Sequence, residues 1–139
     1  MSIKDRYLAY AAAFEQSFDD DDWTRIAPFF TEDAVYEGDP PAHGRDAVLM
    51  KLKNGVDNFD RRMDSRTPDF QTPQVTGSTL TMKWKVSYTK AGLPKLVMSG
   101  TETAVFKGDC IAILRDDFDP SAQQALGDWM KQHGAALRS

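Results

Sequence analysis

The chain has 139 residues, of which 41% are apolar, and it contains eight Phe, four Tyr and three Trp. This length suits one domain with one closed core and leaves no room for two. Seventeen Lys and Arg against 21 Asp and Glu give a formal charge of −4, a sign that repels phosphate backbones and anionic lipids. We therefore expect a single domain over residues 1–139 that binds neither nucleic acid nor membrane.

Two features of the sequence indicate the cellular compartment. The first residues mix charges of both signs without an apolar run of secretory length, and no stretch approaches the roughly 18 apolar residues of a membrane-spanning helix. The single cysteine, Cys110, cannot close an intrachain disulfide. We expect a cytoplasmic protein.

The N-terminal part of the chain has helical periodicity. Apolar side chains recur at steps of three and four from Ile3 to Phe18, which predicts a helix that begins after Ser2. The four aspartates at 19–22 end this helix, because their charges repel one another beside helix carbonyls that are already negative. We expect a solvated turn there, followed by a short second helix over 23–30.

A strand and a third helix are expected next. Residues 34–37 have the composition of a strand, and the glycine, aspartate and prolines at 38–41 end it. Apolar side chains at helical spacing from Val48 to Met63 then predict the third helix. Gly55 lies inside this helix, where glycine costs about 1 kcal/mol relative to alanine.

In the second half of the chain the apolar period changes from that of a helix to that of a strand. Strict alternation over residues 80–88 predicts a half-buried strand, and two further strands are expected at 96–106 and 110–118. Short turns join all three, which predicts an antiparallel meander. Asp119 followed by Pro120 is typical of a helix N-terminus and predicts a closing helix. Helices followed by a run of strands indicate an α+β fold.

Three segments of the sequence resemble one protein superfamily. They are Phe29 to Tyr36, Gly44 to Val48 and Ile113 to Asp119, in this order and spacing. Together they resemble the SnoaL-like branch of the nuclear transport factor 2-like superfamily, over nearly the whole chain. The resemblance implies a cone-shaped α+β fold, in which a curved antiparallel sheet wraps around the N-terminal helices and a C-terminal helix follows. It also implies a pocket for a small apolar ligand of a steroid, polyketide or terpenoid kind, and a homodimer formed through the sheet.

Members of this superfamily differ in their chemistry, so individual residues must decide the function. Compared with limonene epoxide hydrolase, Tyr36 and Asp116 stand where that enzyme has a water-positioning tyrosine and one catalytic aspartate. Its arginine and second aspartate are replaced here by Trp84 and Val86, or by two lysines if the strand register is shifted by one. Epoxide opening needs a second acid to protonate the departing oxygen, and neither register supplies that aspartate.

The resemblance to ketosteroid isomerase is also partial. Glu102 stands where that enzyme keeps a protonated aspartate that donates a hydrogen bond to an oxyanion. The base of the isomerase would fall at Gly38 or Asp39, and its tyrosine near Phe14. Two of the three working groups are therefore either absent or without a definite position here.

Glu102 is the first catalytic candidate. It shares its strand face with Ala104 and Phe106, an apolar setting in which a carboxyl keeps its proton to higher pH. Two alternatives are a salt bridge with an arginine such as Arg45 or Arg115, and exposure to solvent.

Asp116 is the second catalytic candidate. It lies two residues after Leu114, so we expect it to face inward beside Glu102. The alternative is a cap or ion pair for the helix that begins at Asp119. Two carboxyls in one apolar cavity cannot both ionise at low cost, so we expect Glu102 to be protonated and Asp116 ionised, with Tyr36 orienting water or a substrate oxygen.

Further side chains are expected to line the pocket, although in a hollow cone such positions also serve as core. They are Phe14, Trp23, Phe59, Trp84, Val86, Tyr88, Met98, Leu114 and Phe118.

No metal or cofactor is expected. His43 and His133 have no Cys, Asp or His partner at ligand spacing, and the aspartate run lacks the alternating order of a calcium loop. Cys110 begins a strand, where an inert thiol is far commoner than a nucleophile. The basic cluster over residues 61–66 lacks interleaved aromatics and is expected to be a solvated face.

The outer face of the sheet supports the expected homodimer. It carries Val97, Val105, Ile111 and Ile113, which is more apolar surface than a solvated face usually shows. For the function itself two hypotheses stay open. One is a cofactor-free acid/base enzyme of the isomerase, cyclase, dehydratase or hydrolase class, and the other is a non-catalytic ligand-binding or dimerisation module.

Overall fold

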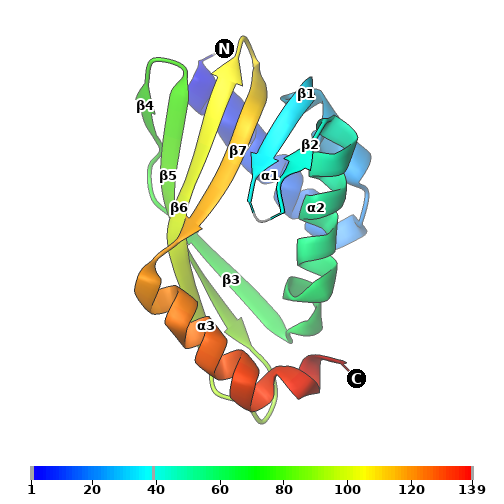
Figure 1. The fold of residues 1–139 in the computed structure, drawn as a ribbon, viewed down its shortest axis with the longest axis vertical. Helices are drawn as coiled ribbons and strands as arrows, with labels where there is room; N and C mark the ends of the chain where they lie inside the picture. The colour runs from blue at the N-terminus through cyan, green and yellow to red at the C-terminus, as the bar shows by residue number, and fades with distance from the viewer. Residues whose placement is uncertain (1, 39, 139) are drawn as a thin grey trace.

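A curved sheet of seven strands carries the fold (Figure 1). The computed structural model describes residues 2–38 and 40–138. The strands lie in the order β2-β1-β7-β6-β5-β3, and β4 also pairs with β5. They are β1 (Phe30–Glu37), β2 (Ala42–His43), β3 (Ser65–Phe70), β4 (Gln74–Thr76), β5 (Thr79–Thr89), β6 (Leu96–Lys107) and β7 (Cys110–Phe118).

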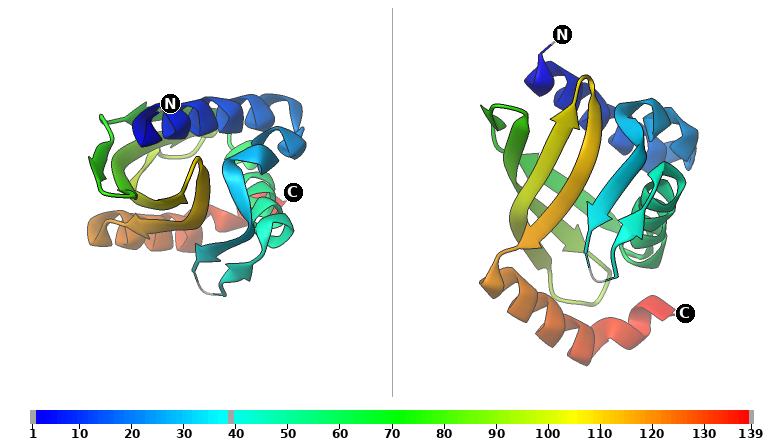
Figure 2. Two further views of the ribbon diagram at one scale, coloured as in Figure 1. Left: turned by 90° about the horizontal axis from the view of Figure 1, so that it is seen from above. Right: turned by 45° about the horizontal axis from the view of Figure 1, so that its top comes forward.

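The described residues also form three α-helices and three short 3-10 helices. Figures 1 and 2 show α1 against the upper part of the sheet and α3 across its lower end. None of the helices in the described residues is long and apolar enough to cross a membrane. The helices are α1 (Ile3–Asp20), η1 (Trp23–Phe29), α2 (Arg45–Asn58), η2 (Asp60–Arg62), α3 (Pro120–His133) and η3 (Gly134–Arg138).

The first helix begins and ends as the sequence predicts. Ser2 caps α1, because its Oγ accepts a hydrogen bond from the backbone N–H of Asp5 at 3.0 Å. Asp21 follows the helix with a positive φ of 60°, a left-handed conformation that ends it.

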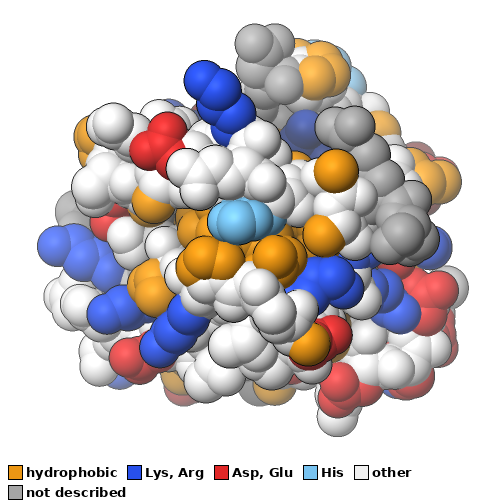
Figure 3. Space-filling model, turned by 90° about the horizontal axis from the view of Figure 1, so that it is seen from below, with side chains coloured by type: hydrophobic (Ala, Val, Ile, Leu, Met, Phe, Trp, Pro, Cys, Tyr) orange, Lys and Arg blue, Asp and Glu red, His pale blue; other side chains and the backbone are white. Residues whose placement is uncertain are grey.

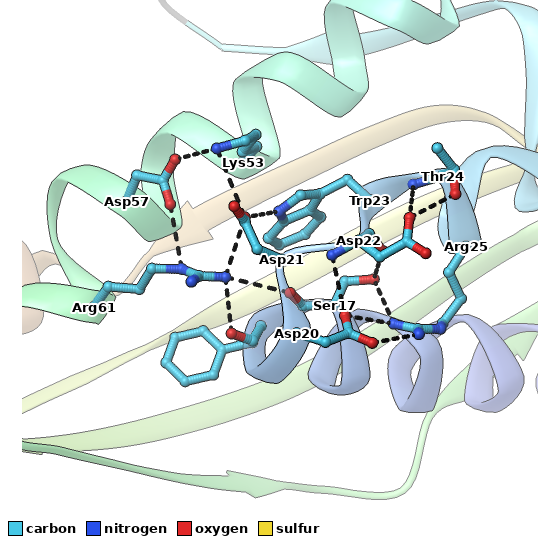
Figure 4. Close-up of polar contacts among 11 residues, drawn as sticks. Ser17, Asp20, Asp21, Asp22, Trp23, Thr24, Arg25, Lys53, Asp57 and Arg61 are labelled. Carbon is cyan, nitrogen blue, oxygen red and sulfur yellow. Dashed lines mark hydrogen bonds and ion pairs between the residues drawn. The ribbon is translucent and has the colours of Figure 1, made fainter.

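The aspartate run at this corner is exposed, as expected, but it is also tied to its neighbours (Figure 4). Asp21 Oδ1 accepts hydrogen bonds from Trp23 Nε1 at 2.7 Å and from Arg61 at 3.2 Å. Lys53 lies 3.6 Å from the same oxygen. The bond from Trp23 is the main cause that lowers the pKa of Asp21, with the two cations adding to it. The turn therefore fastens the end of α1 to α2.

Two of the predicted helices differ in form from the prediction. The second is the 3-10 helix η1, which contains Pro28 and so lacks one backbone donor. The third was expected to extend to Met63, but α2 ends at Asn58. Phe59 leaves the helical conformation, with φ −135° and ψ −66°, and its ring packs edge-on against Tyr88 at 5.0 Å.

The sheet is mixed rather than wholly antiparallel. The meander of β5, β6 and β7 is antiparallel and confirms the predicted strands. β1, however, pairs with β7 in parallel, with Val35 opposite Ile113 and Tyr36 opposite Leu114. A parallel pair needs a long crossover, and here most of the chain lies between the two strands. The α+β class is confirmed, and one strand pair departs from the expected direction.

Three short strands escaped the sequence analysis because they lack an alternating apolar pattern. β3 is a polar segment that contains Pro68, and it lies at one end of the strand order, where a missing N–H is tolerated. β2 has two residues and β4 has three exposed ones, too few for a periodicity to appear.

The expected side-chain parity is confirmed on β5. Met82 and Val86 are buried and Trp84 is half-buried, whereas Lys83 and Lys85 are exposed. On β7 the parity changes, because the register shifts between Val105 and Phe106.

This shift corrects the prediction for the outer face. Ile111 was expected outside, but it pairs with Phe106 and is fully buried. Val97, Val105 and Ile113 are half-buried. The outer face is therefore less apolar than the sequence indicates.

Two apolar clusters fill the inside of the fold. The larger joins α1, η1 and α2 to the upper strands, and Tyr7, Ile26 and Leu80 are among its fully buried members. The smaller lies beneath α3, with Trp129, Met98 and Val86. Figure 3 shows this end of the molecule, where apolar side chains gather around a histidine.

The path of β6 across Trp84 requires glycine at position 100. A Cβ there would meet the backbone oxygen of Asp117 and would lie 2.9 Å from Trp84 Cζ2. We expect Gly100→Ala to lower the free energy of unfolding by about 1–3 kcal/mol, because neither neighbour can move freely. The measurement is urea unfolding followed by circular dichroism.

Gly55→Ala is the matched control. A Cβ at Gly55 has nothing within 4 Å, and the residue lies inside α2. We expect this change to raise the stability by up to about 1 kcal/mol. An unfolding midpoint of Gly100→Ala equal to that of the wild type would contradict the close packing at β6.

Candidate functional site

The inner face of the sheet and one side of α1 line an open-sided cavity of about 190 Å³. For comparison, an engineered apolar cavity of about 150 Å³ binds benzene. The volume therefore suits a molecule built on one or two rings. The lining residues are Tyr7, Tyr10, Ala11, Phe14, Glu15, Leu52, Asp60, Arg66, Phe70, Met82, Trp84, Val86, Tyr88, Glu102, Asp116 and Phe118.

Seven of the residues proposed from the sequence lie in this lining. Glu102 and Asp116 come from the middle strands of the sheet, and Phe14 comes from α1. The other four are Trp84, Val86, Tyr88 and Phe118.

Four residues expected in the pocket belong to the packed core instead. The ring of Trp23 packs edge-on against Phe14 at 5.3 Å and so stands behind the lining. Leu114 is 1% exposed within the larger apolar cluster. Met98 and Phe59 pack in the smaller cluster beneath α3. Leu114 and Met98 have the inward strand parity of pocket residues, but both are buried in the core.

Glu102 and Asp116 are directly opposite each other on β6 and β7. Both are half-buried, and both line the cavity. Among the described contacts, no ion pair joins Glu102 or Asp116 to an arginine. Arg115, considered as a partner from the sequence, pairs instead with Asp117 at 2.8 Å and with Glu37 at 3.8 Å. The two carboxyls thus face the cavity without a basic partner.

Each carboxyl accepts a hydrogen bond from a tyrosine. Tyr7 Oη on α1 donates to Glu102 Oε1 at 2.8 Å, and Tyr36 Oη on β1 donates to Asp116 Oδ2 at 2.9 Å. Burial raises the pKa of both tyrosines, and the nearby carboxyl raises each further. Both phenols therefore remain protonated donors at neutral pH.

The two carboxyls differ in how strongly they hold a proton. Burial raises the pKa of Glu102 well above its ordinary value, and the charge of Asp116 adds to this. Burial also raises the pKa of Asp116, but the hydrogen bonds from Glu102 and Tyr36 oppose the rise. The pair is therefore most stable with one proton in total. Glu102 carries this proton and donates it in a hydrogen bond to Asp116.

Tyr36 lies behind this pair rather than in the cavity wall. Its hydroxyl donates a hydrogen bond to Asp116, and its ring packs against the larger apolar cluster. Lys51 Nζ lies 5.2 Å from the ring centroid. That Tyr36 orients water or a substrate oxygen stays a prediction, while the structure shows its hydroxyl bound to Asp116. The indole of Trp84 is also close enough to lower the pKa of Asp116, although its buried Nε1 makes no regular hydrogen bond to a described residue.

A second polar group lies at the other end of the cavity. Arg66 donates to Glu15 Oε1 at 2.6 Å and to Asp60 Oδ2 at 2.8 Å, and Tyr88 Oη donates to the same Asp60 oxygen at 3.2 Å. The Arg66 side chain is only 10% exposed. Burial raises the pKa of Asp60, and the bonds from Arg66 and Tyr88 partly oppose this.

The basic cluster over residues 61–66 is therefore not simply a solvated face. Arg66 is part of the cavity wall, while Arg61 donates to the carbonyl oxygen of Phe18 at 2.8 Å. Arg62 donates to the carbonyl oxygen of Leu137 at 2.6 Å. Each arginine thus fastens a different part of the chain.

Several lining residues were missed by the sequence analysis. The helical spacing of Tyr7 and Tyr10 placed them on one apolar face, which gave no sign of a polar role for Tyr7. Glu15, Asp60 and Arg66 come from three different elements, and nothing in their local sequence indicates that they meet. Asp39, considered as a base in the isomerase comparison, lies outside the described residues.

Comparison with known proteins identifies the fold. No protein-family model and no curated protein matches the sequence. The structure, however, is similar to that of Bal32a from a soil-derived mobile gene cassette, with a TM-score of 0.67 and 12% identity. The match covers 92% of this chain and 98% of Bal32a.

Two further solved structures support the same fold. TerC, co-crystallised with polyporic acid, has a TM-score of 0.66 and 12% identity, over 91% of this chain and 98% of TerC. A candidate SnoaL-like polyketide cyclase from Shewanella denitrificans OS-217 has a TM-score of 0.65 and 12% identity, over 90% of this chain and 96% of its own. The chain has the cone-shaped nuclear transport factor 2-like fold that these structures share. At these identities the likeness concerns the fold alone.

The raised carboxyl pKa values predict a pH dependence of stability. A buried carboxyl keeps its proton after the unfolded chain has lost it, so stability falls as pH rises from about 4.3 toward the folded pKa. The Glu102→Gln side chain cannot ionise and keeps an oxygen for Tyr7 to donate to. We therefore expect this variant to gain stability relative to the wild type as pH rises through that interval, measured by urea unfolding from about pH 4 to about pH 9.

Asp19→Asn provides the control for this titration. Asp19 is an exposed carboxyl on α1 outside the cavity, so its removal should leave the pH dependence of the wild type in place. A difference in stability between Glu102→Gln and the wild type that stays constant at every pH would show that Glu102 does not hold a raised pKa.

Proposed function

We propose that this protein is a cofactor-free acid/base enzyme acting on a small, largely apolar molecule. The observation that carries the proposal is the pairing of Glu102 and Asp116 in the cavity wall, each held by a tyrosine and neither by a basic group. The fold alone does not decide this function, since the same fold supports many activities. The neighbour crystallised with polyporic acid supports a small organic ligand.

In this proposal the two carboxyls have opposite roles. Asp116, ionised and oriented by Tyr36, takes a proton from a C–H or O–H bond of the substrate. Glu102, protonated and held by Tyr7, gives its proton to a substrate oxygen as negative charge develops there. When the proton on Asp116 returns to the substrate and Glu102 recovers its own, the pair again holds one proton. Isomerisation and cyclisation through an enol fit this cycle without a cofactor.

Epoxide hydrolysis is the less suitable member of the same reaction class. It needs an activated water and a separate acid, which the resemblance would place on β5. There the inward positions hold Trp84 and Val86, neither of which transfers a proton. We therefore favour proton transfer within the substrate.

A general probe can test the proposed chemistry without the natural substrate. The neutral ring compound 5-nitrobenzisoxazole opens to a coloured phenolate when a base removes its C–H proton. We expect the wild type to accelerate this reaction and Asp116→Asn to lower kcat/KM by about a hundredfold, because the base is gone. The rate is followed by absorbance.

Controls separate the specific site from a general protein effect. Asp19→Asn, which removes an exposed carboxyl on α1 outside the cavity, should keep the wild-type rate. Binding of the probe by the wild type without any acceleration over Asp116→Asn would reject the enzyme hypothesis. That result would favour the alternative function, a ligand-binding module without chemistry.

We also propose that the protein acts as a homodimer in the cytoplasm. The half-buried Val97, Val105 and Ile113 on the outer face of the sheet support a partner there. The single cysteine and the negative net charge fit a reducing compartment without nucleic acid as partner.

The dimer predicts a defined result in analytical ultracentrifugation. At tens of micromolar, roughly the concentration at which a stable interface is fully formed, the protein should sediment with twice the mass of one chain. Val105→Lys should shift it to the monomer, because it places a charge in the interface. A wild-type monomer at this concentration would disprove the dimer.

A further inference from the structure

The charged side chains of the cavity wall are unevenly balanced. Four carboxyls line it, those of Glu15, Asp60, Glu102 and Asp116, against one basic group, the guanidinium of Arg66. With one proton shared by the two middle-strand carboxyls, the wall carries a net negative charge. Such a cavity opposes entry of an anion, because the charge of the ligand would lose its water and meet like charge.

Arg66 does not provide a free positive charge for an anionic ligand. Its guanidinium already donates to both Glu15 and Asp60, so its charge is compensated twice over. Glu15 uses only Oε1 in this bond, and its Oε2 takes no hydrogen bond from a described residue. The Glu15 side chain is 34% exposed and lines the cavity. This end of the cavity therefore presents an acceptor with a negative charge.

The walls between the two polar ends are aromatic. Tyr10 and Phe14 come from α1, Trp84 and Tyr88 from β5, and Phe118 from the end of β7. The negative faces of such rings attract a cation, an effect that strengthens when water is excluded. Aromatic walls and excess carboxylate are thus two separate features that favour the same sign of ligand charge.

The two polar ends are separated by the length of a small molecule. Tyr7, which holds Glu102, and Glu15 are eight residues apart on α1, which corresponds to about 12 Å along the helix. A ligand can therefore place one group at Glu102 and Asp116 and another at Glu15, with an apolar body between them.

We propose that the cavity selects a molecule with an apolar ring body and a protonated amine, with the ammonium group bound at Glu15 and Asp60. This rests on the proposed function, because it names the substrate class for the same cavity and leaves the opposite end of the ligand at the acid/base pair. The ammonium donates to the free oxygen of Glu15 and packs against the ring of Tyr88 or Phe14.

A matched series of three probes tests the sign of the ligand charge. The probes are 3-phenylpropylamine, 3-phenylpropan-1-ol and 3-phenylpropanoate, which share one body and differ in the end group. Binding is measured at pH 7 by the NMR shift of the Trp84 indole N–H, an indicator inside the cavity wall. We expect the amine to bind about tenfold tighter than the alcohol and the carboxylate to bind weakest.

A charge-matched pair of variants on one helix locates the amine. Glu15→Gln keeps an oxygen for Arg66 but loses the charge, and it should weaken amine binding about fivefold or more while leaving the alcohol unchanged. Asp19→Asn removes one exposed carboxylate from the same helix, outside the cavity, and should change neither. Melting temperatures of both variants establish that each is folded.

Three outcomes would overturn the proposal. They are equal or tighter binding of the carboxylate, equal binding of amine and alcohol, and amine binding that Glu15→Gln does not alter. No shift of the Trp84 signal by the amine would overturn it as well. These results leave the nitrobenzisoxazole experiment untouched, so an acid/base enzyme for neutral ligands would still stand if that reaction depends on Asp116.

Discussion

The burial of two carboxyls on neighbouring strands is the constraint on which the site depends. Glu102 and Asp116 are cross-strand partners, so the sheet itself holds them close, and both cannot ionise there at low cost. Two phenols, one from α1 and one from β1, donate hydrogen bonds to the pair. They stabilise it without adding a positive charge. An arginine in either place would fix both carboxyls as anions and remove the difference in pKa that acid/base chemistry needs.

The two phenols reach the carboxyls through different parts of the fold. Tyr7 lies on a helix capped by Ser2, and its ring is buried in the larger cluster, so its hydroxyl has little freedom. Tyr36 lies on β1, whose parallel pairing with β7 brings it beside Asp116. The parallel pair is therefore more than an exception to the meander, because it connects the N-terminal half of the chain to the acid/base pair. The tight contact of Gly100 with Trp84 adds a rigid wall on the same side.

Sequence reasoning succeeded where a pattern is local. Alternation along β5 gave the correct inward face, and the same parity gave both carboxyls on β6 and β7. It failed where the decisive contact joins distant segments. Tyr7 and Glu102 are 95 residues apart, and Arg66 meets Glu15 across 51 residues. The bulge beside Phe106, which turned Ile111 inward, also leaves no sign in a simple alternation.

The cavity wall differs from what the resemblance to limonene epoxide hydrolase implies. Where the resemblance calls for an arginine and an aspartate on β5, the inward positions carry Trp84 and Val86, so the middle of the wall is apolar. The charged groups lie at the two ends of the cavity. At one end Glu102 and Asp116 share a proton, and at the other Arg66 is paired with Glu15 and Asp60. A wall of this kind orients a ligand along its length rather than across it. In the proposed function, reaction at one end of the cavity and recognition at the other are then separate tasks.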